Sequence, residues 1–242
     1  MLTCMNVSIT NNHLRGGIEI KSKKTNVLLP NITNVKILRK EYRSVIWTLM
    51  YTVDISSADD LNFSLFDILT KSNKRYSYSF DVMSENTILE SQIFDGIECW
   101  FDGLFVGNFD HQFFAFGNCD TDSRRNTSVE YVETLASRTP YRVANANINY
   151  VTGKSSGLFF DIDLNDQFVP DYNHEYSENV VDFLTDNTAK ILKTSDGQMW
   201  YISVDDTVTL PFHDRYIGKN EIEFNWTEIG DIPITGMVID DE

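Results

Sequence analysis

The dipeptide Asp196-Gly197 constrains the fold of this chain more than any other feature, because it stands between two apolar runs. A two-residue type I′ turn needs positive φ at both central residues, and glycine adopts it without strain. Residues 191–193 and 199–204 are therefore predicted to pair as an antiparallel hairpin, with Gly197 as a structural residue.

The segment 221–230 is predicted to add a third strand to that hairpin. Its apolar residues alternate with polar ones, which is the period-two pattern of a strand with one buried face. Three tryptophans lie on the apolar parity of predicted strands and are expected core residues: Trp47, Trp200 and Trp226.

Short apolar or alternating runs bounded by turn residues recur along the chain and predict further strands. They lie at residues 18–20, 27–29, 44–55, 76–82, 87–94, 97–101, 104–109, 113–116, 129–135, 141–150 and 156–164. The turns expected between them include the lysine-rich bend 21–24, Asp95-Gly96, Asp102-Gly103 and Gly153. Hairpins in such close succession indicate an all-β fold, either a β-sandwich or a β-barrel.

Two segments show the 3.6-residue periodicity of a helix instead. Leu61, Leu65, Ile68 and Leu69 form one apolar stripe behind serine and aspartate caps, and a second stripe follows Asp171. These patterns predict two short helices, near residues 59–70 and 172–186.

The polar stretch 118–128 has no hydrophobic periodicity and is the best candidate for a domain boundary. We therefore predict an N-terminal β-rich domain at 1–120 and a C-terminal β-rich domain at 121–242.

The net charge of −16 is unevenly distributed. Residues 1–50 carry eight lysines and arginines against two glutamates, a net charge of +6, so that the remainder carries −22. The acidic body disfavours nucleic acid as a partner, because affinity for phosphates comes from cations. The polarity indicates either a solvated surface or a basic end that meets acidic surface of a neighbouring copy. The candidate assembly residues are Lys21, Lys23, Lys24, Arg39 and Lys40.

No catalytic or metal-binding pattern stands out. The four histidines have no partner at ligand spacing, and the sequence contains no nucleophile elbow and no phosphate-binding loop. Residues 161–166 resemble part of a calcium loop but lack its central glycine and terminal glutamate. We therefore predict no enzymatic activity, no cofactor and no metal.

No apolar run approaches the ~18–20 residues that a membrane-spanning helix needs. The N-terminus lacks the layout of a signal peptide, and the three cysteines are odd in number, without paired spacing. These features predict a protein made in the cytosol, with reduced thiols and no membrane insertion.

Three groups of residues carry a family resemblance. They are 135–145 with 149–159, 182–193, and 196–200 with 224–231. In this order they resemble tail and baseplate structural proteins of bacteriophages of Gram-positive bacteria, close to the distal-tail proteins. The resemblance implies a non-enzymatic virion component that assembles as a ring at the tail tip. Its partners would be further copies of itself and neighbouring tail or baseplate proteins.

Two other classes of function compete with this one. A carbohydrate-binding module that recognises host-surface sugar is suggested by Trp100, Trp200 and Tyr201 on predicted sheet faces. Exposed, coplanar aromatic rings would favour it, whereas buried rings would favour assembly. An acidic cell-wall glycosidase is a third possibility, since the spacing of paired carboxylates is set by the fold and not by sequence distance.

Overall fold

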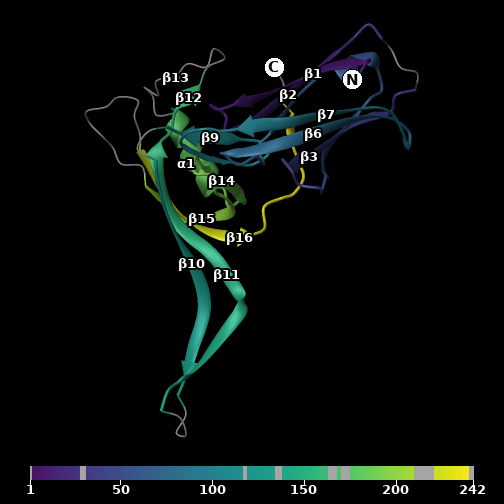
Figure 1. Ribbon diagram of the computed structural model, residues 1–242. Coiled ribbons are helices and arrows are strands. Elements are labelled where there is room, and N and C mark those ends of the chain that lie inside the picture. Colours follow the sequence, from purple (N-terminus) through teal and green to yellow (C-terminus); the bar gives the residue numbers. More distant parts are fainter. Residues whose placement is uncertain are drawn as a thin grey trace. The chain divides into compact units, whose positions relative to one another are not determined.

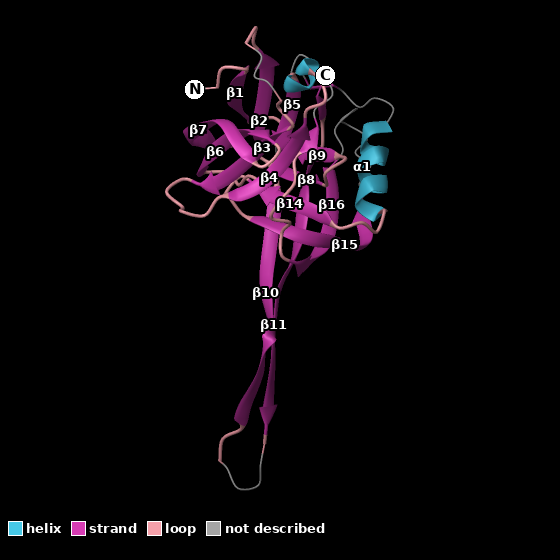
Figure 2. Cartoon of the chain, turned by 90° about the vertical axis from the view of Figure 1, so that its right-hand side faces the viewer, coloured by secondary structure: helices cyan, strands magenta, loops and turns pink. Residues whose placement is uncertain are grey.

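The computed structural model describes residues 2–27, 31–116, 119–133, 138–162, 168–169, 175–209 and 221–239. These residues confirm the all-β prediction, since strands dominate and are joined by one α-helix and one short 3-10 helix (Figures 1 and 2). The chain forms two compact units: Met1–Phe114 with Lys193–Met199 and Ile232–Glu242 make up the first, and Ala115–Leu192 with Trp200–Asp231 make up the second.

The first unit contains two four-stranded antiparallel sheets, with the orders β1-β2-β5-β17 and β4-β3-β6-β7. Their strands are β1 (Met5–Asn12), β2 (Gly17–Lys24), β3 (Asn34–Glu41), β4 (Thr48–Asp54), β5 (Phe63–Asp67), β6 (Lys74–Ser84), β7 (Thr87–Cys99) and β17 (Val238–Ile239). The 3-10 helix η1 (Ala58–Leu61) and the short strands β8 (Leu104–Gly107) and β9 (Gln112–Ala115) complete the described elements around them. Both sheets are open, with free edge strands.

Asp67, a fully buried residue of β5, joins the two sheets of the first unit. Arg39 of β3 donates from Nη1 to both Asp67 carboxylate oxygens at 2.7 and 2.8 Å, and the Tyr78 hydroxyl of β6 donates to Oδ2 at 2.8 Å. The Leu69 backbone N–H donates to Oδ1 at 3.0 Å. Burial would lower the pKa of Arg39, but the carboxylate outweighs it and raises that pKa. This network satisfies the buried charge, which would otherwise be strongly destabilising.

The second unit is built on an antiparallel sheet with the order β10-β11-β16-β15. Its elements are β10 (Asp120–Val132), β11 (Tyr141–Leu158), β12 (Asp161–Ile162), β13 (Phe168–Val169), α1 (Glu175–Thr185), β14 (Lys190–Thr194), β15 (Met199–Thr209) and β16 (Glu221–Gly230). The helix predicted near 172–186 is thus confirmed over its described residues, whereas its proposed cap Asp171 lies outside them.

The hairpin predicted around Asp196-Gly197 is confirmed as β14 and β15, but its turn is not of type I′, because Gly197 has a positive φ and Asp196 does not. The Thr194 N–H donates to the Gln198 carbonyl at 3.1 Å, and the Gly197 N–H donates to the Thr194 carbonyl at 3.0 Å. Gly197 has φ +89°, and a Cβ atom there would lie 2.7 Å from the Ser72 carbonyl oxygen. Glycine is therefore required at this position both by the backbone conformation and by the available space.

The alternation predicted for 221–230 is also confirmed, because Ile222, Phe224 and Trp226 of β16 are all fully buried. The Trp226 ring lies 4.9 Å from the ring of Trp200, which is 7% exposed. A Cβ atom at Gly153 of β11 would lie 2.4 Å from Trp226 Cζ2. The strand crosses the indole so closely that only glycine fits.

Gly153 therefore corrects a prediction, since it lies inside the continuous strand β11 and not in a turn between two strands. The stretch 118–128 was proposed as the domain boundary, and its described residues from Asp120 onward belong to strand β10. Both segments lie in the same strand pair, in which the polar sequence gives little sign of pairing.

The helix predicted at 59–70 is wrong. Only η1 forms there, and Phe63–Asp67 is strand β5, which pairs with β2 on one side and β17 on the other. The apolar stripe Leu61, Leu65, Ile68 and Leu69 is nevertheless buried, as expected. Tertiary pairing outweighs the local helical periodicity in this segment.

Three predicted turns also differ from the structure. The lysine-rich segment 21–24 continues strand β2, which pairs with β1. Asp95-Gly96 lies within β7 at a break in the register with β6, where Gly96 has φ +73° and marks a bulge. Asp102-Gly103 connects β7 to β8 in a different sheet, so it closes no hairpin.

The segment 44–55 is less buried than predicted. Strand β4 begins only at Thr48, and Trp47, expected in the core, precedes it and is half-buried. Val45 and Ile46 are 88% and 71% exposed. The apolar composition of this segment suggested a central strand, buried on both faces. β4 is instead an edge strand, and with only one neighbouring strand in its sheet its side chains are less covered.

Candidate functional site

The three lysines proposed for assembly lie together near the end of β2, in the first unit. Lys21 and Lys23 share one face of the strand, and the Lys21 ammonium lies 3.4 Å from the Glu19 carboxylate. Lys24 forms an ion pair with Asp59. Lys23 is exposed and makes no ion pair with any described residue.

The other two assembly candidates are not part of this cluster. Arg39 is held in the buried ion pair with Asp67, where its side chain is 14% exposed. The Lys40 ammonium lies 4.6 Å from the centre of the Trp47 ring, a cation–π contact. Arg39 and Lys40 are thus engaged within the first unit, as Lys21 and Lys24 are through their ion pairs with Glu19 and Asp59.

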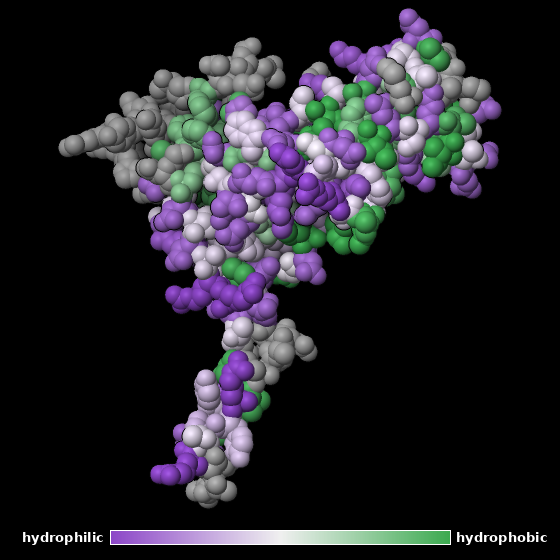
Figure 3. All heavy atoms as spheres, viewed as in Figure 1, coloured by the Kyte–Doolittle hydropathy of each residue, from purple (hydrophilic) through white to green (hydrophobic). Residues whose placement is uncertain are grey.

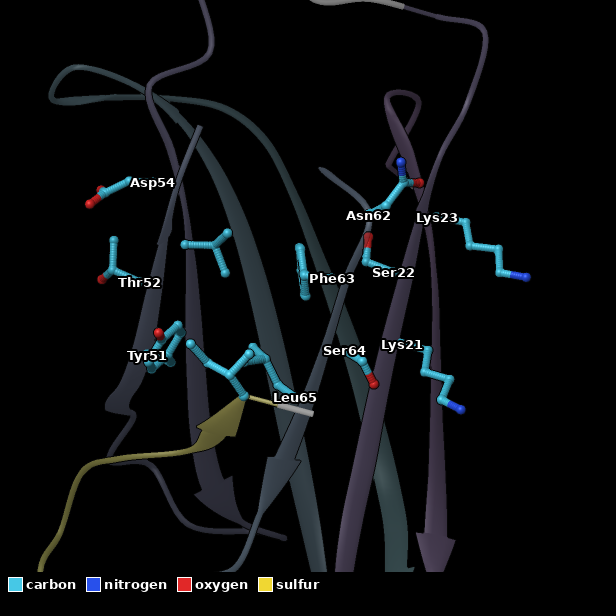
Figure 4. A pocket seen from close by; sticks show the side chains of 12 residues that line it. Lys21, Ser22, Lys23, Tyr51, Thr52, Asp54, Asn62, Phe63, Ser64 and Leu65 are labelled. Atoms are coloured by element: carbon cyan, nitrogen blue, oxygen red, sulfur yellow. The ribbon is translucent and has the colours of Figure 1, made fainter. Parts of the chain in front are cut away.

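A groove opens beside Lys21 and Lys23, with a volume of about 660 Å³ (Figure 4). Its walls come from β2, β4, β5 and β17 of the first unit. The lining residues are Lys21–Lys23, Tyr51–Asp54, Asn62–Leu65 and Ile239. The two lysines lie side by side on β2, and their amino groups point away from Tyr51, Phe63 and Leu65 (Figure 4). Because Ser22 is paired with Phe63 and Lys21 with Ser64, the lysines and the apolar side chains lie on opposite faces of the sheet.

In the second unit, β10 and β11 continue as a two-stranded ribbon beyond the rest of their sheet (Figures 1 and 2). β11 pairs with β16 only from Thr152 to Leu158, so its residues 141–151 have β10 as their sole strand neighbour among the described residues. We call the two strand segments 125–132 and 141–151 the arm.

The arm exposes an unusual number of large apolar side chains. Tyr131, Tyr141 and Val143 are 67%, 61% and 53% exposed, and Val132 and Tyr150 are also exposed. Hydrophobic residues are visible on its surface among hydrophilic ones (Figure 3). A two-stranded ribbon has no second layer to cover such side chains, and isolated hairpins are marginally stable in water. Strands were predicted at 129–135 and 141–150, but their extension beyond the rest of the sheet was not.

The described residues hold no group of three or more histidine, cysteine, aspartate or glutamate side chains that would bind a metal. His13 and His111 lie among them, whereas His174, His213 and most of the calcium-like stretch 161–166 lie outside. No helix in the described part of the chain is long and apolar enough to cross a membrane.

One buried lysine has the perturbed ionisation that often marks a reactive group. Burial lowers the pKa of Lys193 to about 8, partly offset by the thiol of Cys99 and the carboxylate of Asp67. Its ammonium donates to the backbone carbonyls of Gly16 and Ile68, the latter at 2.8 Å, and the side chain is almost fully inaccessible. Lys193 therefore caps carbonyls in the interior of the first unit and offers nothing to a substrate.

The aromatic residues proposed for sugar binding do not form one platform. Trp200 is buried against Trp226, and Tyr201 is half-buried. Trp100 is 48% exposed and stacks on His13, with ring centres 5.0 Å apart and planes 14° from parallel. A single exposed tryptophan covered on one side by histidine is a weaker motif than the coplanar row that sugar recognition calls for.

Comparison with known proteins leaves the family open. No protein-family model matches the sequence, and no curated protein matches it. Among solved structures, this chain is similar to a protein chain from the virion of a native gene transfer agent particle. The two sequences are 12% identical, the TM-score is 0.34, and the match covers 57% of this chain and 96% of the virion chain.

This chain is also similar to a protein chain from the tail of an empty gene transfer agent particle with C6 symmetry. The identity is 12%, the TM-score is 0.32, and the match again covers 57% of this chain and 96% of the other. At these TM-scores neither likeness carries an argument.

Proposed function

We propose that this chain is a non-enzymatic structural component of a phage tail tip or baseplate, and that it assembles as a ring joining the tail tube to the host-recognition parts. Its partners are further copies of itself and adjoining tail proteins, and its location is the virion. The resemblance of residues 135–231 to distal-tail proteins suggested this role.

The arm is the observation that carries the proposal. Its apolar side chains are exposed on a ribbon that no described element of its own unit covers. Exposed apolar patches of this kind mark interaction sites, because burying them against a partner removes them from water. A ring of copies requires a head-to-tail contact between two different surfaces, and we propose that the arm is one of them.

Removing the arm should abolish self-association. In the test variant, residues 126–150 are replaced by Asn-Gly, which joins Arg125 to Val151 by a two-residue turn suited to a hairpin. Light scattering after gel filtration should find oligomers of the parent and only monomers of the variant.

The control is the thermal unfolding of both proteins followed by circular dichroism, which should show that the shortened chain is folded. Oligomers of equal size in parent and variant would contradict the proposed role of the arm.

A further inference from the structure

The sheet β4-β3-β6-β7 of the first unit carries a row of apolar side chains on one face. Leu38 of β3 is paired with Leu49 of β4 on one side and with Ser79 of β6 on the other. Ser79 is in turn paired with Ile93 of β7. Directly opposed residues of an antiparallel pair point to the same face, so these side chains form one row across all four strands.

This row lies on the outer face of the sheet. The adjacent residues Ile37 of β3 and Phe80 of β6 point to the other face and are fully buried. In the row itself, Leu49 and Ile93 are 41% and 54% exposed, and Leu38 is half-buried. The wet face of an antiparallel sheet is ordinarily polar. An apolar row that crosses it is therefore a candidate contact surface for a partner.

A lysine stands beside the row on the same face. Lys36 is two positions from Leu38 on β3 and makes no ion pair with any described residue. Asp81 lies opposite Lys36 on β6. Its carboxylate accepts hydrogen bonds from the hydroxyls of Ser79 and Ser91, at 3.1 and 2.5 Å. A partner that matches this face presents apolar side chains in one row and a carboxylate in the next.

One face of the arm has this pattern. Val132 is paired with Tyr141, and Glu130 is paired with Val143. Residues two positions apart on a strand point to the same face, so the four side chains form an apolar row next to a row that holds one carboxylate. All four are exposed. Neighbouring rows on one face of a strand are about 6.6 Å apart, so the row spacing is the same on both surfaces.

We propose that the distal end of the arm of one copy packs on the outer face of the β4-β3-β6-β7 sheet of the next copy, with Glu130 opposite Lys36. Val132 and Tyr141 then cover the apolar row. The inference rests on the proposed self-assembly and deepens it, because it names the second surface of the head-to-tail contact.

A charge-exchange experiment on the full-length chain tests this pairing. The variants are Glu130→Lys, Lys36→Glu and the double variant, and self-association is measured by sedimentation velocity at low and moderate salt. Each single reversal places like charges together and should weaken association about tenfold or more, whereas the double variant should recover most of that loss. The recovery should shrink as salt screens the pair.

Lys74→Glu is the matched control for the lysine. Lys74 is the exposed first residue of β6 in the same sheet, away from the apolar row, and it makes no ion pair with a described residue. Combining Lys74→Glu with Glu130→Lys should give no recovery. Every variant should unfold thermally like the parent, and the milder Glu130→Gln, with a smaller loss of association, replaces a reversal that does not fold.

Two tyrosines of the arm provide an uncharged test of the same face. Tyr141→Ala removes an apolar side chain from the docking face and should weaken association about tenfold. Tyr131 is equally exposed but points to the other face of the ribbon, so Tyr131→Ala should leave association unchanged. Equal losses for the two variants would overturn the assignment of the face.

The outcomes separate this inference from the proposed function. If the arm-shortened protein is monomeric but the losses of Glu130→Lys and Lys36→Glu simply add, assembly through the arm stands and this sheet face is not its acceptor. If the full-length parent never associates, the proposed function fails and the pairing fails with it.

Discussion

Replacing Trp226 by alanine should lower the free energy of unfolding by about 3–5 kcal/mol, the usual effect of truncating a large buried aromatic residue. Trp226 is fully buried, packs on Trp200 and fills the space left by Gly153. Its indole N–H also donates to the Ser155 hydroxyl at 2.9 Å. Alanine would leave a cavity between the strands of the main sheet of the second unit, where Trp226 is paired with Gly153 of β11 and Val204 of β15.

The measurement is urea unfolding followed by far-UV circular dichroism, which does not rely on tryptophan fluorescence. Trp100→Ala is the matched control, because Trp100 is about half exposed and its removal should change stability by at most about 1 kcal/mol. Equal unfolding midpoints for Trp226→Ala and the parent would show that the tryptophan is not a core residue.

The stability of the parent relative to a Lys193→Met variant should rise between about pH 8 and pH 9. Below pH 8 both the folded and the unfolded chain carry the lysine proton, and the full penalty of the buried charge is present. Above the folded pKa of about 8 the native state loses the proton, while the unfolded lysine keeps it up to its ordinary pKa of 10.5. Stability rises wherever the unfolded state binds more protons, by at most about 1.4 kcal/mol per pH unit for one group.

Other buried groups act in the opposite direction, which is why the comparison uses a variant. Burial raises the pKa values of Cys99 and Tyr78, so both groups ionise in the unfolded chain first and lower stability at higher pH. Both groups are present in parent and variant, so the contribution of Tyr78 cancels. Lys193 itself lowers the pKa of Cys99, so the part of the Cys99 contribution that depends on Lys193 belongs to the measured difference. Urea unfolding of both proteins at about pH 7, 8 and 9 gives the difference. A difference that does not change with pH would show that Lys193 keeps its ordinary pKa.

The parts of the fold that the sequence predicted well are those in which local chemistry and burial agree. Asp196-Gly197 supplies the turn, and the alternation of Ile222, Phe224 and Trp226 marks the buried face of a strand. Each signal lies within the turn or strand that it specifies. Neither depends on a distant partner.

The errors come from segments whose structure is decided by distant partners. Phe63–Asp67 has apolar residues at helical spacing, yet it forms a strand because β2 and β17 supply hydrogen bonds on both of its edges. The segment from Asp120 to Ser128 has no hydrophobic periodicity, so its pairing with β11 was not predicted. The strands of the arm were predicted at 129–135 and 141–150, but whether another layer covers them depends on the rest of the fold and not on their own residues.

The assembly residues show the same limit. The charge count singled out Arg39 and Lys40 together with the lysines of β2, but composition does not reveal that Arg39 is paired with Asp67 in the interior. The exposed apolar residues of the arm, Tyr131 and Tyr141 among them, were missed because an exposed tyrosine and a buried one look alike in sequence. An apolar pair at matched positions in an otherwise polar hairpin is the signal that could have identified them.

The central claim is that this chain is built into the tip of a virion tail. The most direct measurement is electron microscopy of purified particles from the host that makes this protein, labelled with a gold-conjugated antibody against residues of the first unit. The account predicts label at the tail end distal to the capsid on intact particles. Particles that carry no label anywhere, with the protein found only in the unassembled fraction, would contradict it.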